Sequence, residues 1–174
     1  MIISNNLKIR AIKEKDLDIV FSFLSDFESK GQFLPIEIQS EVNFRNEYET
    51  NGFITEKASR YVLVSKDEEV IGLTWVFTSV PYFDAVEIGY HVFDKSSRNK
   101  GYATEAVNAL VNYLFESKQL NRIEIRIAVG NTASEKVAQK NGFLHEGISR
   151  QAAFSKGKHH DMHVYSKLRS EWHS

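Results

Sequence analysis

Six consecutive residues could bind an anion through their backbone. They are Arg98, Asn99, Lys100, Gly101, Tyr102 and Ala103. Apolar side chains recur behind them at helical spacing, so we expect a helix to begin at this turn. The first N–H groups of a helix lack partners inside it, and the helix dipole and two basic side chains also favour negative charge. We predict a phosphate ligand, which the backbone can approach closely at Gly101.

This motif alone is a weak signal, because a glycine between a basic loop and a helix is as often simple turn chemistry. No Gly-Lys-Ser/Thr follows it, and it lacks the three glycines of a dinucleotide fingerprint. Its context strengthens the prediction. Residues 85–93 before it and residues 122–129 after the helix both have the composition of strands.

A second run with possible chemistry is His159-His160-Asp161-Met162-His163. Alternate residues of a strand share a face, so His159, Asp161 and His163 would lie on one side. Ligands about 7 Å apart along a single strand cannot converge on one tetrahedral ion without further partners. We therefore predict no metal site here.

Composition excludes several function classes. The chain has 174 residues, 42% hydrophobic side chains and no cysteine, which predicts one domain over residues 1–174 without disulfides or cysteine nucleophiles. Lys and Arg number 22 against 23 for Asp and Glu, a balance that argues against direct nucleic-acid or membrane binding. The N-terminus turns polar too early for a signal peptide, so we expect a cytoplasmic protein.

The candidate residues need strands and helices to position them. Alternating or β-branched segments predict strands at residues 7–11, 60–65, 70–78, 85–93, 122–129, 143–154 and 159–168. Amphipathic segments predict helices at residues 13–24, near 40–50, from the motif turn through residue 115, and for about nine residues after Asn131. Residues 28–53 form the least regular part, a plausible wall for a substrate cleft.

The order of these elements predicts a mixed α/β fold of the α+β class. Residues 60–93 read as an antiparallel meander of three strands, and residues 155–158 read as the turn of a final hairpin. The helix after the motif should return the chain as a right-handed crossover, so residues 122–129 lie parallel to residues 85–93. We expect a largely antiparallel central sheet with one parallel pair, flanked by helices.

The motif residues 98–103 match Q/R-x-x-G-x-G/A, the acyl-CoA signature, so the chain resembles the GNAT N-acetyltransferase superfamily. Residues 131–134, residues 140–143, Glu146-Gly147 and Arg150 are similar to the downstream signature of its ribosomal-protein N-terminal acetyltransferase (Rim-type) branch. The resemblance covers nearly the whole chain except residues 28–59. It implies a GNAT fold, acetyl-CoA as the acyl donor and an enzyme that acetylates a primary amine.

The resemblance also implies where acetyl-CoA binds. In this superfamily the pyrophosphate lies on the amides of the motif turn, and the acetyl group lies where two parallel strands splay apart. Val92 is the expected backbone donor to the thioester carbonyl, because unpaired N–H groups in such a gap stabilise developing negative charge. The full expected set for the donor is Val92, Phe93, Arg98, Asn99, Lys100, Gly101, Tyr102, Ala103, Thr104, Asn131 and Ser134.

Glu87 is the predicted general base. It lies before the motif at the offset where histone-acetylating relatives place a glutamate base, and a carboxylate there could take the amine proton through a water. It could instead orient the amine electrostatically. His91, four residues on, shares its facing and could relay a proton, but packing against the pocket wall is favoured.

Ser134 is the predicted donor to the departing thiolate, as the Rim-type pattern implies, whereas many GNAT members use a tyrosine. The alternative is that its hydroxyl caps the helix, which is equally favoured. Asn131 is predicted mainly as the N-cap of that helix. Asp161 recurs in the Rim-type hairpin, with either a structural or a substrate-facing role.

The function we expect is direct acetyl transfer in a ternary complex, to a protein or peptide N-terminal α-amine. An alternative acceptor is a small amine, such as a polyamine, an amino sugar or an aminoglycoside. Another alternative is a non-catalytic acyl-CoA-binding module. Aromatic residues between Phe33 and Phe53 could form an apolar wall for a peptide, and acids in the same stretch could attract a polyamine. A homodimer is compatible with the sequence.

Overall fold

A computed structural model describes residues 1–31 and 33–172. The strands are β1 (Ile2–Ile3), β2 (Leu7–Ala11), β3 (Ala58–Ser65), β4 (Val70–Thr78), β5 (Ala85–Val92), β6 (Arg122–Ala128), β7 (Leu144–Ser155) and β8 (Lys158–Leu168). The helices are α1 (Leu17–Ser25), α2 (Glu41–Asn51), α3 (Tyr102–Ser117) and α4 (Thr132–Lys140), with short 3-10 turns at Glu14–Asp16, Lys95–Ser97 and Arg169–Glu171.

All the strands join one eight-stranded sheet in the order β1-β2-β3-β4-β5-β6-β8-β7. Neighbouring strands are antiparallel except β5 and β6, which are parallel on either side of the α3 crossover. The predicted mixed fold with one parallel pair is therefore confirmed. No sequence pattern predicted β1, which pairs with β2 over only two residues, or the internal position of β8.

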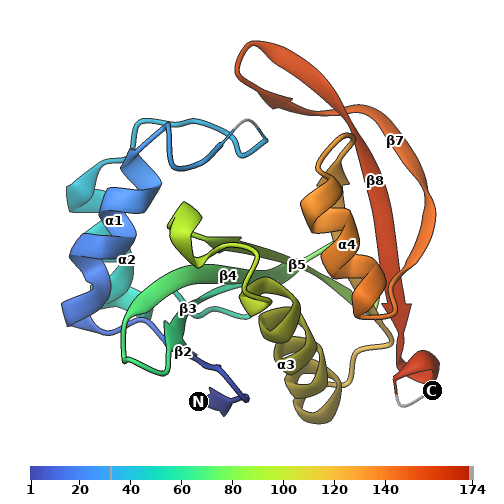
Figure 1. Ribbon diagram of the computed structural model, residues 1–174, viewed down its shortest axis with the longest axis horizontal. Helices are drawn as coiled ribbons and strands as arrows, with labels where there is room; N and C mark the ends of the chain where they lie inside the picture. The colour runs from blue at the N-terminus through green and yellow to red at the C-terminus, as the bar shows by residue number, and fades with distance from the viewer. Residues whose placement is uncertain (32, 173–174) are drawn as a thin grey trace.

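Helices cover both faces of the sheet, with α1 and α2 on one face and α3 and α4 on the other (Figure 1). The apolar stripe of α3, which includes Ala106, Leu110 and Leu114, packs against Ile88 of β5 and Ile123 of β6. A second core lies under α1 and α2, where Phe23 and Phe44 pack with Leu73 of β4. The two cores fix both faces of the strands that carry the candidate site.

Local sequence signals explain where several helices begin and end. Ser40 accepts a hydrogen bond from the N–H of Asn43 at 3.3 Å and thereby caps α2, which ends at Gly52 with φ 61°. Asn131 caps α4 in the same way through the N–H of Ser134, also at 3.3 Å. Both capping residues are types that prefer this position because their side chains satisfy a free N–H group.

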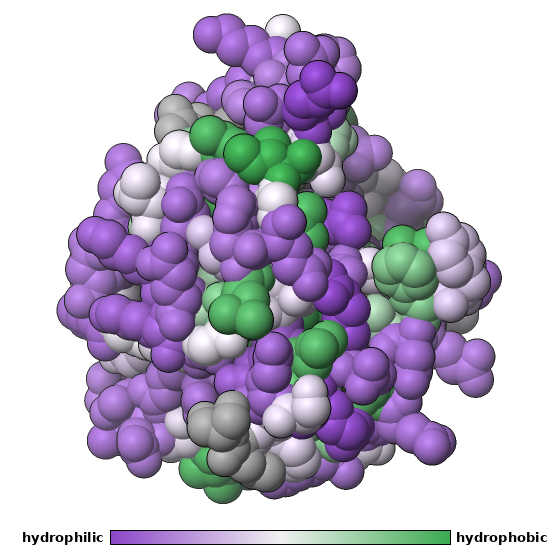
Figure 2. Space-filling view, turned by 90° about the vertical axis from the view of Figure 1, so that its right-hand side faces the viewer, coloured by the Kyte–Doolittle hydropathy of each residue, from purple (hydrophilic) through white to green (hydrophobic). Residues whose placement is uncertain are grey.

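The face shown in Figure 2 is mainly hydrophilic, with apolar side chains scattered across it. Exposed apolar residues on the hairpin strand β7 are Leu144, Ile148 and Phe154. Scattered exposed apolar residues are ordinary on a protein surface. Within the described residues, no helix has both the length and the apolar character needed to cross a bilayer.

Candidate active site

The site begins where β5 and β6 separate. These strands pair at three positions, Ala85 with Arg122, Val86 with Ile123 and Glu87 with Glu124. Beyond them β5 stays paired with β4 as far as Val92, whereas β6 stays paired with β8 as far as Ala128. The two strands therefore follow different neighbours and open a gap, as the family resemblance implied.

Backbone geometry directs the N–H group of Val92 away from β4. The N–H of Phe93 donates to the carbonyl of Ile71 in β4 at 2.9 Å. Successive residues in an extended strand present their N–H groups to opposite sides. The N–H of Val92 therefore points to the β6 side, where the gap lies.

The motif turn adopts a shape that exposes its amides. Asn99 and Gly101 have left-handed backbone angles, with φ 61° and 84°, and Gly101 is the N-cap of α3. The N–H groups of Tyr102, Ala103 and Thr104 precede the first intrahelical hydrogen bond, which Glu105 donates to Gly101 at 3.0 Å. Apart from the two neighbouring residues in the chain, a Cβ added at Gly101 would meet no protein atom within 4 Å, so the space beside this turn is open to a ligand.

Arg98 does not extend freely toward that space. Its Nε donates to the carbonyl of Val92 at 3.2 Å, and its Nη2 donates to the carbonyl of Phe93 at 3.3 Å. The same Nη2 lies 3.3 Å from Nε2 of His91. The guanidinium thus satisfies the carbonyls at the end of β5, and the part of Arg98 in binding the acyl donor stays a prediction.

Glu87 occupies the last paired position before the gap, on the face of the sheet that α1 and α2 cover. Its side chain is 18% exposed and forms an ion pair with Arg126, in which Oε2 of Glu87 lies 3.1 Å from Nε of Arg126. Burial raises the pKa of Glu87 to about 6, while Arg126 opposes that rise and Glu124 adds to it. A carboxylate with this pKa is largely ionised at neutral pH and is a stronger base than an ordinary glutamate.

His91 lies against the wall formed by α1. Its ring centroid is 4.7 Å from that of Phe23, which also stacks on Phe93 at 4.3 Å. Burial, aided by the charge of Arg98, lowers the pKa of His91 to about 4. The favoured interpretation of a packing residue fits these contacts, because the ring stays neutral at pH 7.

The second wall of the gap is the first turn of α4. Asn131 caps this helix, so its predicted capping role is confirmed. The carbonyl of Ser134 accepts a hydrogen bond from the hydroxyl of Tyr90 at 3.2 Å. Tyr90 was missed in the sequence, although Ile88 and Val92, two residues to either side of it on β5, place it on the α3 and α4 face.

Asp161 has a structural role in the final hairpin. Its Oδ1 accepts the N–H of Gln151 at 2.7 Å, and Gln151 has φ 50° where the β7–β8 register shifts. Arg150 and Gln151 line a hollow of about 510 Å³. In the part of the chain that the structure describes, no three His, Asp or Glu side chains are arranged to hold a metal ion.

The region 28–53 differs from its predicted role. Phe44 and Phe53 are 4% and 2% exposed in the α1–α2 core, so they form no wall of a cleft. Phe33 does lie at the surface side, where its ring centroid is 6.3 Å from that of His160 on the hairpin. Residue 32 of this region falls outside the described residues.

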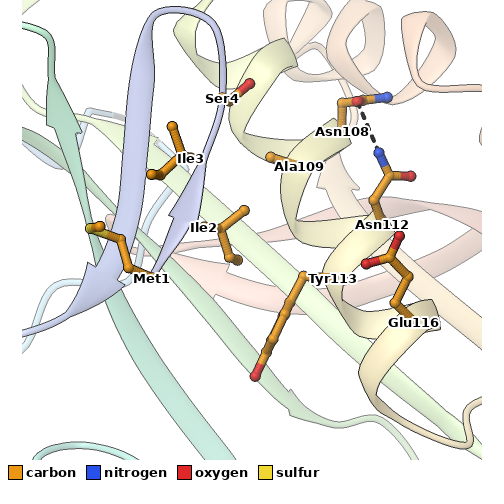
Figure 3. A pocket seen from close by; sticks show the side chains of 9 residues that line it. All are labelled: Met1, Ile2, Ile3, Ser4, Asn108, Ala109, Asn112, Tyr113 and Glu116. Atoms are coloured by element: carbon orange, nitrogen blue, oxygen red, sulfur yellow. Dashed lines mark hydrogen bonds between the residues drawn. The ribbon is translucent and has the colours of Figure 1, made fainter.

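A pocket of about 330 Å³ lies elsewhere, between β1 and the C-terminal half of α3 (Figure 3). Its lining residues include Ile2, Asn112 and Tyr113, and Asn112 donates to Asn108 at 3.3 Å. The motif turn is at the other end of α3. This pocket therefore contains none of the predicted site residues.

Comparisons with known proteins agree with this geometry. Residues 6–144 match the model of the acetyltransferase (GNAT) domain. The chain is 44% identical over 86 residues to a putative ribosomal N-acetyltransferase of Bacillus subtilis, a match that covers 49% of this chain and 46% of that protein. It is 26% identical to a ribosomal-protein-serine acetyltransferase of Escherichia coli, over 95% of this chain and 94% of that protein.

A solved structure of spermidine N-acetyltransferase from Vibrio cholerae, in complex with CoA and spermine, superposes with a TM-score of 0.85. It covers 97% of this chain and 98% of that chain at 20% sequence identity, which shows a shared fold. The sequence resemblance and the predicted use of acetyl-CoA are thus confirmed. The chain belongs to the GNAT acetyltransferase family, the acetyl-CoA-dependent N-acetyltransferases.

Proposed function

We propose that this enzyme acetylates the free α-amine of a protein or peptide N-terminus. The amine nitrogen attacks the thioester carbonyl carbon, the carbon–sulfur bond breaks, and CoA leaves as the thiol. One proton must leave the amine and one must reach the sulfur. Glu87 accepts the first, directly or through a water. The hydroxyl of Ser134 donates a hydrogen bond to the departing thiolate, which takes the second proton from solvent water.

The observation that carries this proposal is the position of Glu87 at the point where β5 and β6 part. Its carboxylate is close to the gap in which the acetyl group would lie, and its pKa of about 6 leaves it ionised at neutral pH. A base whose pKa is near the working pH takes up a proton without staying protonated. Glu87 thus has the properties of the general base.

Residues around the gap also fit the acyl donor. The free amides of Tyr102, Ala103 and Thr104 suit a pyrophosphate, because they combine unpaired donors with the positive end of the α3 dipole. The N–H of Val92 faces the gap and can donate to the thioester oxygen as it becomes negative. Lys100, on the exposed side of the turn, adds positive charge.

Proton cost favours an α-amine over a lysine or polyamine acceptor. About a tenth of α-amines are neutral at pH 7, against well under a thousandth of lysine-type amines, and one modest base suits the former. The acids that could attract a polyamine are partly engaged, since Glu41 pairs with Arg45 and Glu47 pairs with Arg60. The similarity to a ribosomal-protein acetyltransferase supports the same acceptor class.

The test is competition between acceptors at neutral pH. Release of the CoA thiol is the measured signal. The panel contains short peptides with free N-termini, the same peptides with blocked N-termini and an internal lysine, spermidine, and an aminoglycoside. We expect the free N-terminal peptides to have the highest kcat/KM. If spermidine or the aminoglycoside exceeds them by about tenfold or more, the acceptor is a small amine and the proposal fails.

A further inference from the structure

A network of buried charges lies directly beside Glu87. Its centre is Glu124 of β6, whose side chain is 2% exposed. Glu124 accepts Nε of Arg122 at 2.7 Å, Nη2 of Arg126 at 2.9 Å and the hydroxyl of Ser79 at 2.7 Å. A buried carboxylate with three donors is held in one position, because each bond would be lost if it moved.

Strand register brings this network to Glu87. Residues 122, 124 and 126 lie on one face of β6. The residues between and after them, Ile123, Ile125 and Ile127, lie on the other face and belong to the core. Glu87 and Glu124 are directly paired at the final position before the strands separate. Arg126 lies two residues beyond that pair, at the start of the gap, and reaches back to both carboxylates.

Arg126 is thus shared between two acids. Its Nε lies 3.1 Å from Oε2 of Glu87, while its Nη2 lies 2.9 Å from Oε2 of Glu124. The β4 residue opposite Glu87 is Phe77, which carries no charge. The charged groups that act on Glu87 are therefore Arg126 and Glu124, both on β6.

The other arginine of the network has a separate anchor. Arg122 pairs with Glu146 of β7 as well as with Glu124. Removing the charge of Glu124 would leave Arg122 with one acidic partner but would leave Arg126 with Glu87 alone. The two ends of the network can therefore be changed independently.

We propose that Arg126 and Glu124 are positioning residues that set the proton affinity of Glu87. Arg126 favours the ionised form of the buried Glu87 carboxylate. Glu124 holds the guanidinium in place and offsets part of the effect of its positive charge on Glu87. This inference rests on the proposed role of Glu87 as the base. It assigns to β6 a function in proton transfer beyond forming one side of the gap.

The experiment is titration of the Glu87 carboxyl group by carbon-13 NMR in the free enzyme, with its signal assigned by its loss in Glu87→Gln. Arg126→Met should move the midpoint upward by about one pH unit, since an opposite charge at this distance is removed. Arg126→Lys should return the midpoint part of the way to its wild-type value, because a lysine keeps the positive charge but cannot bind both carboxylates in the way the guanidinium does. Glu124→Gln should move the midpoint downward, because Arg126 then has a single ionised partner.

Glu146→Gln is the matched control, since it removes the far partner of Arg122 and should leave the Glu87 midpoint unchanged. The acid limb of the kcat/KM profile should shift to higher pH in Arg126→Met and to lower pH in Glu124→Gln. If Arg126 and Glu124 were merely structural, Arg126→Met and Glu124→Gln would both lower activity without moving the pH midpoint in opposite directions. That outcome overturns the inference. Because the NMR titration needs no turnover, it reports the Glu87 midpoint whether or not Glu87 is the base, and failure of the base assignment is detected separately by the kinetics of Glu87→Gln.

Discussion

The hydroxyl of Tyr90 on β5 donates to the backbone carbonyl of Ser134 in α4 at 3.2 Å. This bond crosses between the strand on one side of the gap and the helix on the other. Burial raises the pKa of Tyr90 to about 12, so the hydroxyl stays protonated and able to donate. The side chain of Tyr90 therefore links the two sides of the gap.

Tyr90→Phe should weaken both the fold and donor binding. A lost hydrogen bond of this kind costs about 1 kcal/mol of unfolding free energy. We expect a several-fold loss of affinity for acetyl-CoA, measured by calorimetry, because α4 is no longer tied to β5. Tyr61→Phe is the control, since Tyr61 packs against the same core cluster from β3. Unchanged affinity in Tyr90→Phe would show that this bond does not shape the site.

Gly101→Val should abolish detectable CoA binding. The added side chain would stand in the open space beside the turn amides, where the pyrophosphate is proposed to lie. Gly101 also has φ 84°, so any side chain strains the backbone. Gly52→Val separates the two effects, because Gly52 has φ 61° and equally open surroundings at the end of α2. If both variants bind CoA as wild type does, the phosphate site lies elsewhere.

Glu87→Gln should lower turnover by about 10² or more with little change in acetyl-CoA affinity. The replacement keeps the shape of the side chain and removes its ability to accept a proton. In the wild type, activity should fall as pH drops through about 6, where Glu87 becomes protonated. The measurement is the pH dependence of steady-state kinetics. Equal rates for the two enzymes across neutral pH would exclude Glu87 from the reaction.

The same substitution should change how stability depends on pH. The pKa of Glu87 is raised in the folded state, so its favourable contribution is present at low pH and is lost as pH rises through about 6. Relative to wild type, Glu87→Gln should gain about 1 kcal/mol of unfolding free energy between pH 5 and pH 7.5. Urea unfolding at both pH values measures this gain. A difference that is independent of pH would contradict the raised pKa.

His91→Phe should retain most activity and leave the acid limb of the rate profile in place. The histidine ring is already neutral above pH about 4 and packs on Phe23, so an aromatic replacement keeps its main contact. Kinetics from pH 5.5 to pH 8, at saturating acetyl-CoA, are the measurement. A fall in turnover comparable to that of Glu87→Gln would instead make His91 a proton relay.

Sequence patterns predicted the strands closely because their apolar residues alternate. The predicted strand at residues 7–11 coincides with β2, and the predicted strand at residues 122–129 ends one residue beyond β6. The helix at residues 40–50 was also placed within one residue of α2, since Ser40 and Gly52 mark its ends. Local signals of this kind need no tertiary information.

Site features that depend on distant contacts were not predictable. Arg98 is visible in the sequence as part of the motif turn, but its bonds to carbonyls at the end of β5 are not. Phe44 reads as a possible cleft wall, but it is buried because it packs between α1 and Phe53. The Arg126 pair with Glu87 requires the β5–β6 register, which no local pattern specifies.

Because β8 lies inside the sheet, between β6 and β7, parts of the fold cannot be completed early during synthesis. Strand β6 pairs with β8 from Arg122 with Leu168 to Ala128 with Met162, so one edge of β6 is not fully paired until residue 168 has been synthesised. Arg169 then donates to the carbonyls of Phe115, Lys118 and Leu120, which fixes the connection between α3 and β6. On the ribosome, the motif turn can form well before this point. The β6 side of the gap is fully paired only after residue 168 has left the exit tunnel.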